Sequence, residues 1–319
     1  YDIGHVFHTP GGGGSGVAYV GVVCDNGTLG SGHYKAGGWS GSSNNASIGW
    51  IGLAAHEFGH MFNMPHSFNG TGGNCTSNIS AYGAYEIGSG STIMSYEGSC
   101  GSQNLPGSGA ADQYFHAHSI QQALNYLNAY SCESSSTLSN TPPVVDANAC
   151  GGSHTIPHST PFRLTATGSD ADGDQIYYTW EQFDEDGQYS PTQGKIGASA
   201  AADSRAQLFR SDPITSDPTR YFPSLDWIVD NQYASDFEPL PTVARTLNFR
   251  VTGRDLYAGG GGIDWSDVAI TVSGSGPFSV TAPNGGQNLS AGNNTTVTWS
   301  LGGTGNYCSS VNIRLSVDG

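Results

Sequence analysis

Positively charged side chains are scarce in this chain. Its 319 residues include 10 Lys and Arg against 26 Asp and Glu, so the formal net charge is −16 at pH 7. Proteins that bind nucleic acid neutralise phosphates with clustered Lys and Arg, and such clusters are missing here. We therefore exclude nucleic acid as a partner. The acidic balance leaves two explanations open, bound calcium or simple solubility.

Long apolar runs are also missing. No run approaches the roughly 20 residues that a membrane-spanning helix needs, and no signal peptide opens the sequence. The 47 glycines and the hydrophobic share of 36% favour a loop-rich and β-rich protein over a helical bundle. Because 319 residues is about twice a typical domain length, we expect two or three domains.

The cysteines do not form a CxxC pair, which argues against a thiolate metal site or a redox motif. Six widely spaced cysteines in a Ser-, Thr-, Asn- and Gly-rich chain favour disulfides, and disulfides favour an exported, extracellular protein. The sequence does not fix their pairing. They are Cys24, Cys75, Cys100, Cys132, Cys150 and Cys308.

Composition divides the chain into zones. Residues 1–132 hold eight of the ten histidines, and residues 133–143 (ESSSTLSNTPP) have the composition of a linker. Residues 144–273 contain alternating polar and apolar segments, which predict a β-sandwich domain. A second break precedes residues 277–319, which resemble the opening strands of another sandwich and stop before it can close. The segments that predict strands are 162–167, 176–180, 246–252, 268–272, 278–283, 295–299 and 311–316.

The first zone combines one predicted strand with two predicted helices, which is an α+β pattern. Residues 16–24 (GVAYVGVVC) read as a strand, and residues 114–130 have apolar side chains at helical spacing. Residues 48–63 also predict a helix, although Gly52 and Gly59 each cost roughly 1 kcal/mol relative to Ala. Asp112 is expected to cap the second helix or to supply a negative charge at its start.

A histidine motif lies on the first predicted helix. Residues 56–66 read HEFGHMFNMPH. On a helix, His56 and His60 lie one turn apart on the same face, so both imidazoles can reach one Zn²⁺. Glu57 adjoins the first ligand without being one, which is the placement that a general base for water activation needs.

The chain after this helix is suited to return a third ligand. Asn63 is a residue type that adopts left-handed backbone angles readily, so it can end the helix, and Pro65 prevents the helix from resuming. His66 then becomes the third zinc ligand. Three histidines leave a fourth position open for water and substrate, as in catalytic zinc sites.

At this point the sequence resembles the metzincin metallopeptidases, whose signature is an extended zinc helix followed by a methionine turn. His56, Glu57, His60, His66 and Met94 match that pattern; Asn63 departs from it, because the family usually has Gly there. The segments YDIGHVF, KAGG, AYEIGSGSTIMSYEGSC and DQYFHAHSI are similar to bacterial secreted reprolysin-like (adamalysin-related) peptidases. The resemblance implies an origin in Bacteroidetes and agrees with C-terminal sandwich modules.

The resemblance implies a secreted zinc endopeptidase that acts on proteins or peptides. Met94 would form a floor beneath the metal, and residues 16–23 would supply the edge strand that pairs with the substrate. Tyr96 matches a tyrosine of astacin-like and serralysin-like metzincins that ligates the metal or stabilises the oxyanion. Reprolysins usually lack it, so the role of Tyr96 stays open. The alternative function is a binding or adhesion module with an auxiliary or inactive zinc site.

The resemblance also implies an incomplete catalytic domain. Metzincins place several strands and a helix before the edge strand, whereas 55 residues precede His56 here. Either the upper subdomain is reduced or, as we expect, the chain is a fragment whose N-terminal part was removed or lies on a second polypeptide.

A second metal site is suggested in the predicted sandwich. Asp170, Asp172 and Asp174 cluster around a glycine, as in calcium loops of Ig-like and cadherin-like sandwiches, and a plain acidic turn explains the same cluster. For the remaining histidines of the first zone we expect structural or surface roles; these are His5, His8, His33, His116 and His118.

Overall fold

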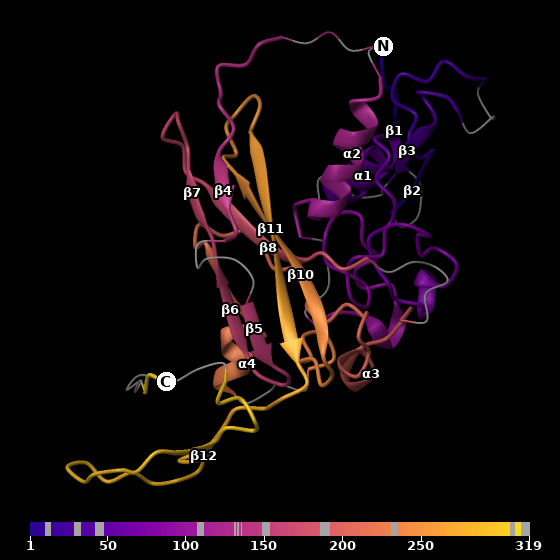
Figure 1. Cartoon of the computed structure of the whole chain (residues 1–319). Helices are drawn as coiled ribbons and strands as arrows, with labels where there is room; N and C mark the ends of the chain where they lie inside the picture. The colour runs from indigo at the N-terminus through magenta and orange to yellow at the C-terminus, as the bar shows by residue number, and fades with distance from the viewer. Residues whose placement is uncertain are drawn as a thin grey trace.

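A computed structural model describes most of the chain, in two parts that pack together (Figure 1). Residues 1–132 form an N-terminal part with a small sheet and two long helices. Residues 144–306 form a C-terminal part that is mostly strands in several small sheets. In the part of the chain described, no helix has the length and apolarity to cross a membrane. The described residues are 1–9, 14–28, 33–41, 48–106, 112–130, 132, 134, 136–148, 154–185, 192–230, 235–306 and 310–313.

The N-terminal sheet contains β1 (Val6–His8), β3 (Gly38–Gly41) and β2 (Ser15–Ala18), in that order. β1 runs parallel to β3, whereas β2 runs antiparallel to it. The strand predicted at 16–24 is therefore too long. After Ala18 the chain leaves the sheet, and the buried Val22 donates its N–H to the carbonyl of Met61 at the end of the first helix.

The two predicted helices are confirmed with shorter bounds. α1 (Ile48–Met61) packs against β2 and β3, and α2 (Ala117–Leu127) follows later in the chain. The prediction that Asp112 caps α2 is wrong. His116 is the N-cap, and its side chain accepts the N–H of His118, while Asp112 lies 3.9 Å from the Arg210 guanidinium of the C-terminal part.

The segment between the helices is largely irregular. Two 3-10 turns, Gly73–Cys75 and Gly101–Gln103, lie within it. Disulfides join Cys75 to Cys100 and Cys24 to Cys132, so the expectation of disulfides is confirmed. The other two cysteines, Cys150 and Cys308, lie outside the described residues.

The C-terminal part is built on a four-stranded sheet with the order β5-β11-β10-β8. Two pairs, β4-β7 and β6-β9, accompany it, and its core joins buried side chains of β6 and β9 to those of β8, β10 and β11. The four segments predicted as strands between 162 and 272 are thus confirmed. The element bounds are β4 Val144–Asp146, β5 His154–Pro157, β6 Phe162–Thr165, β7 Thr167–Ser169, β8 Tyr177–Gln182, α3 Gly197–Ala201, β9 Thr219–Phe222, α4 Leu225–Val229, β10 Arg245–Arg254 and β11 Ile263–Ser273.

Beyond residue 273 the described chain forms one further pair, β12 (Ser279–Ala282) with β13 (Thr298–Ser300). This pair projects away from the rest of the molecule (Figure 1). Two of the predicted strands, 278–283 and 295–299, correspond to it. Of the third, residues 311–313 are not in a strand, and residues 314–316 lie outside the described part.

Candidate active site

Three histidines converge at the end of α1. His56 and His60 lie on the helix and are buried. His66 follows the helix and is half-buried. One ligand nitrogen from each can be chosen so that all three lie within 4.8 Å of one another, and within the described residues this is the only group of its kind. The spacing-based prediction that these three residues meet is confirmed.

The turn that brings His66 back occurs at Asn63. Its φ is +68°, in the left-handed region, as its residue type predicted. The N–H of Asn63 bonds to the carbonyl of His60, and the N–H of Met64 bonds to the carbonyl of Gly59. These bonds close the C-terminal turn of the helix, and Pro65 follows immediately.

Each histidine ring is oriented by a backbone carbonyl. The Nδ1 atoms of His56, His60 and His66 lie 2.7, 2.8 and 2.6 Å from the carbonyl oxygens of Ile93, Met64 and Asn78, in that order. A carbonyl only accepts, so each Nδ1 carries the proton and each Nε2 keeps its lone pair. Burial lowers the pKa of all three rings, that of His66 to about 4, which keeps them neutral.

The resulting donor set fits a zinc ion. The Nε2 atoms of His60 and His66 are 3.1 Å apart. Because both carry lone pairs, this approach is not a hydrogen bond between the rings. Two nitrogens bound to one tetrahedral zinc at about 2.0–2.1 Å would be separated by about 3.3 Å. The structure therefore holds the ligand atoms close to the separation that a shared ion requires.

Glu57 lies between the histidines and β2. Its side chain is only 4% exposed, and burial raises the pKa of its carboxyl to about 7. The backbone of Gly16 passes so close that a Cβ there would lie 2.5 Å from Glu57 Oε1 and 2.6 Å from its Cγ. Gly16 thus has to be a glycine for the carboxylate to occupy this place. No sequence pattern signals this contact, because the two residues are far apart in the chain.

A cleft of about 960 Å³ runs past His56 and Glu57. Its lining comes from Gly14 and the start of β2, from α1 around His56 and Glu57, and from two loops, residues 73–78 and 93–99. The disulfide Cys75–Cys100 ties these two loops together.

Tyr96 contacts the histidine cluster, and Met94 contacts α1 at Gly59. The Tyr96 ring packs edge-on against His66, with centroids 4.5 Å apart, and lines the cleft. Burial, and then the charge of Glu57, raise the pKa of its hydroxyl, so Tyr96 is a neutral hydrogen-bond donor. Met94 is fully buried beneath α1, where a Cβ on Gly59 would lie 2.4 Å from its sulfur.

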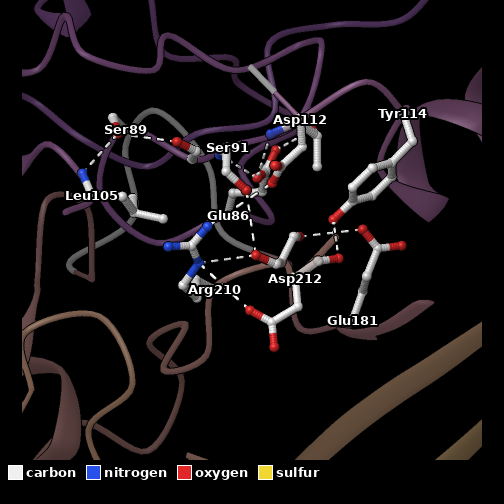
Figure 2. Close-up of polar contacts among 12 residues, drawn as sticks. Glu86, Ser89, Ser91, Leu105, Asp112, Tyr114, Glu181, Arg210 and Asp212 are labelled. Carbon is white, nitrogen blue, oxygen red and sulfur yellow. Dashed lines mark hydrogen bonds and ion pairs between the residues drawn. The ribbon is translucent and has the colours of Figure 1, made fainter. Parts of the chain in front are cut away.

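A buried carboxylate that sequence reasoning missed supports the loop leading to Met94. Glu86, 1% exposed, accepts hydrogen bonds from the N–H groups of Ser91 and Thr92 and from the hydroxyls of Ser67 and Thr92 (Figure 2). Four donors to one carboxylate hold the start of the methionine loop rigidly. A lone Glu offers no spacing pattern from which this could have been predicted.

The predicted calcium residues lie far along the chain, in the loop between β7 and β8. Asp170 Oδ1 accepts the N–H groups of Asp172 and Asp174, at 2.8 and 3.2 Å, and Asp172 Oδ2 accepts the N–H of Thr141. The three carboxylates do not form a group of ligand atoms within 4.8 Å of one another. These bonds are those of an acidic turn.

Two other histidines of the N-terminal part, His116 and His118, are buried away from the cluster. His118 stacks on Tyr85 with ring centroids 4.0 Å apart, and His116 lies 3.6 Å from Glu181. His5 stacks on Phe58 of α1 and hydrogen-bonds to Ser40. These contacts agree with the structural roles predicted for them.

Comparison with known proteins assigns the N-terminal part. A family model described as metallo-peptidase family M12B, reprolysin-like, matches residues 1–127. No curated protein matches the chain. The match covers the sheet, both long helices and the histidine cluster. Residues 1–127 are therefore a reprolysin-like M12B metallopeptidase domain, with the three-histidine cluster that is typical of a metzincin zinc site.

Proposed function

We propose that the chain is a secreted, zinc-dependent endopeptidase that hydrolyses peptide bonds in proteins. The observation that carries the proposal is the convergence of His56, His60 and His66 beside the buried carboxylate of Glu57, where His56 and Glu57 line a cleft. Family membership supports a peptidase, and the two disulfides agree with an extracellular location.

The three histidine Nε2 atoms would hold the zinc ion. When bound, zinc supplies a Lewis acid that polarises the scissile carbonyl and makes water more acidic. An extended substrate would pair with β2, whose backbone lies along the cleft at Ser15 and Gly16. Main-chain hydrogen bonds to this strand would place the scissile carbonyl next to the histidines and Glu57.

Glu57 would move the proton. Its carboxylate accepts a proton from the attacking water and then donates it to the nitrogen of the leaving amine. The pKa of about 7 that burial gives this carboxyl suits both steps, because the group can gain and lose a proton near neutral pH. Tyr96, neutral and beside His66, would donate a hydrogen bond to the developing oxyanion.

The experiment that tests the proposal compares the wild type with Glu57→Gln. The variant keeps the three ligands and the shape of the side chain, so we expect it to bind zinc normally and to lose casein cleavage by at least a hundredfold. Tyr96→Phe should retain zinc and lose less activity. A Glu57→Gln variant as active as the wild type would contradict the assigned role, and zinc binding without cleavage by the wild type would favour a binding module.

We also propose that residues 144–273 form an Ig-like or cadherin-like sandwich domain after a linker at 133–143, with 277–319 as the start of another. The shared core of β6 and β9 with β8, β10 and β11 supports this architecture. Calcium at Asp170, Asp172 and Asp174 stays a prediction. A chelator selective for calcium over zinc should lower the melting temperature if calcium binds there, and an unchanged temperature would assign the loop as a plain turn.

A further inference from the structure

The C-terminal part contacts the metallopeptidase domain next to the zinc ligands. The contact region contains the loop of residues 89–93 and residues 112–117, which lead into α2 (Figure 2). Neither segment has helix or strand bonding of its own before Ala117. Their backbone positions therefore depend on bonds from elsewhere in the protein: Glu86 of the same domain binds Ser91 and Thr92, and the C-terminal part also contributes.

A chain of three hydrogen bonds leads from the C-terminal part to a zinc ligand. The Tyr114 hydroxyl donates to the carbonyl of Asp212 at 2.7 Å. The carbonyl of Tyr114 accepts the N–H of Ile93 at 3.1 Å. The carbonyl of Ile93 accepts the Nδ1 proton of His56 at 2.7 Å. The side chain of Tyr114 is buried, so water does not compete for its hydroxyl.

Further hydrogen bonds from the C-terminal part fix both segments. Ser91 donates its hydroxyl to the carbonyl of Ser211 at 3.3 Å. Glu181 of β8, 0% exposed, accepts the N–H of Ala117 at the first turn of α2. Arg254 of β10 donates to the carbonyl of Phe115. Buried polar groups such as these are costly to leave unpaired, so the two parts are held in one arrangement.

We infer that the C-terminal part positions the zinc ligand His56 through Tyr114, and is thus a structural component of the metal site. The inference rests on the proposed function. Tyr114 is a positioning residue, since it acts on the site through Ile93. The groups that orient a metal-bound histidine typically change metal affinity 10- to 100-fold when they are removed. Tyr114 acts one bond further out, which places it at the lower end of that range.

The test is the zinc affinity of the 319-residue chain carrying Tyr114→Phe, measured by competition with a chromophoric chelator at 25 °C. We expect its Kd for zinc to rise about tenfold. Tyr178→Phe is the matched control, because it removes a buried tyrosine hydroxyl from the C-terminal part without touching this path, and it should leave the Kd unchanged. Ser91→Ala is a smaller change that removes the neighbouring hydrogen bond to the Ser211 carbonyl, and it should also raise the Kd for zinc.

The outcomes separate this inference from the proposed function. Unchanged zinc affinity in both Tyr114→Phe and Ser91→Ala would overturn it. If Tyr114→Phe does not fold, Ser91→Ala alone decides. A wild type that binds zinc but cleaves nothing would refute the endopeptidase while leaving this test intact, and a wild type that binds no zinc would overturn both.

Discussion

Replacing Gly16 by Ala would push the general base out of place without touching the metal ligands. The new Cβ would lie 2.6 Å from Glu57 Cγ, whereas carbon atoms in contact prefer about 3.5–4.0 Å. Glu57 would therefore have to withdraw by about 1 Å. A displacement of that size in a catalytic group costs on the order of 100-fold in rate.

The stability of the protein should change much less than its activity. Gly16 lies in β2 without a positive φ, so Ala suits the backbone there, and the atoms that give way belong to a flexible side chain. We expect a change in unfolding free energy of about 1 kcal/mol or less. Zinc content should equal that of the wild type, because the three atoms nearest to the added methyl group all belong to Glu57, which is not a ligand.

The assay is steady-state cleavage of a fluorogenic peptide, with zinc content measured on the same samples. Gly274→Ala is the control for the Gly-to-Ala change, since a Cβ there meets no atom within 4 Å. We expect kcat to fall about 100-fold in Gly16→Ala and to stay unchanged in Gly274→Ala. Wild-type kcat in Gly16→Ala would refute the assignment of Glu57 as the base.

Three further predictions concern stability. Gly59→Ala should lower the free energy of unfolding by about 1–3 kcal/mol, because its Cβ would collide with the Met94 sulfur. Gly52→Ala lies in the same helix, where its Cβ meets open space, and should raise the free energy of unfolding by up to about 1 kcal/mol. Urea unfolding of the metal-free protein measures both changes. Asn63→Ala should lower the free energy of unfolding by about 1 kcal/mol more than Asn63→Gly in the same assay, since φ is +68° there. Equal losses in the two variants would contradict the left-handed turn at Asn63. Burial, and then the charge of His116, lower the pKa of His118 to about 3 from 6.5. The unfolded chain therefore binds a proton that the folded protein excludes between these values, and stability should fall by about 2 kcal/mol more from pH 7 to pH 5 in the wild type than in His118→Gln.

The zinc ligands were predictable because they lie within one short stretch of chain. Helix geometry alone places His56 and His60 on one face, and the backbone preference of Asn63 supplies the turn to His66. Both are local properties. The presence of disulfides was predictable, because the number and type of the residues indicate oxidation. Their pairing was not predictable, because only the fold brings the partners together.

Long-range contacts account for what the sequence did not predict. The approach of Gly16 to Glu57 joins a strand to a helix far along the chain, and the apolar run 16–24 gave no sign that β2 ends at Ala18. Asp112 looked like a helix cap because it precedes a helical pattern. In the fold, Tyr114 and Phe115 are used instead to contact the C-terminal part, so α2 begins only at Ala117.

The most direct test of the central claim is the zinc content of the purified chain, measured beside casein cleavage with and without 1,10-phenanthroline. We expect about one zinc per chain, held by His56, His60 and His66, and cleavage that phenanthroline abolishes and added zinc restores. A chain without zinc, or cleavage that survives removal of the metal, would contradict it.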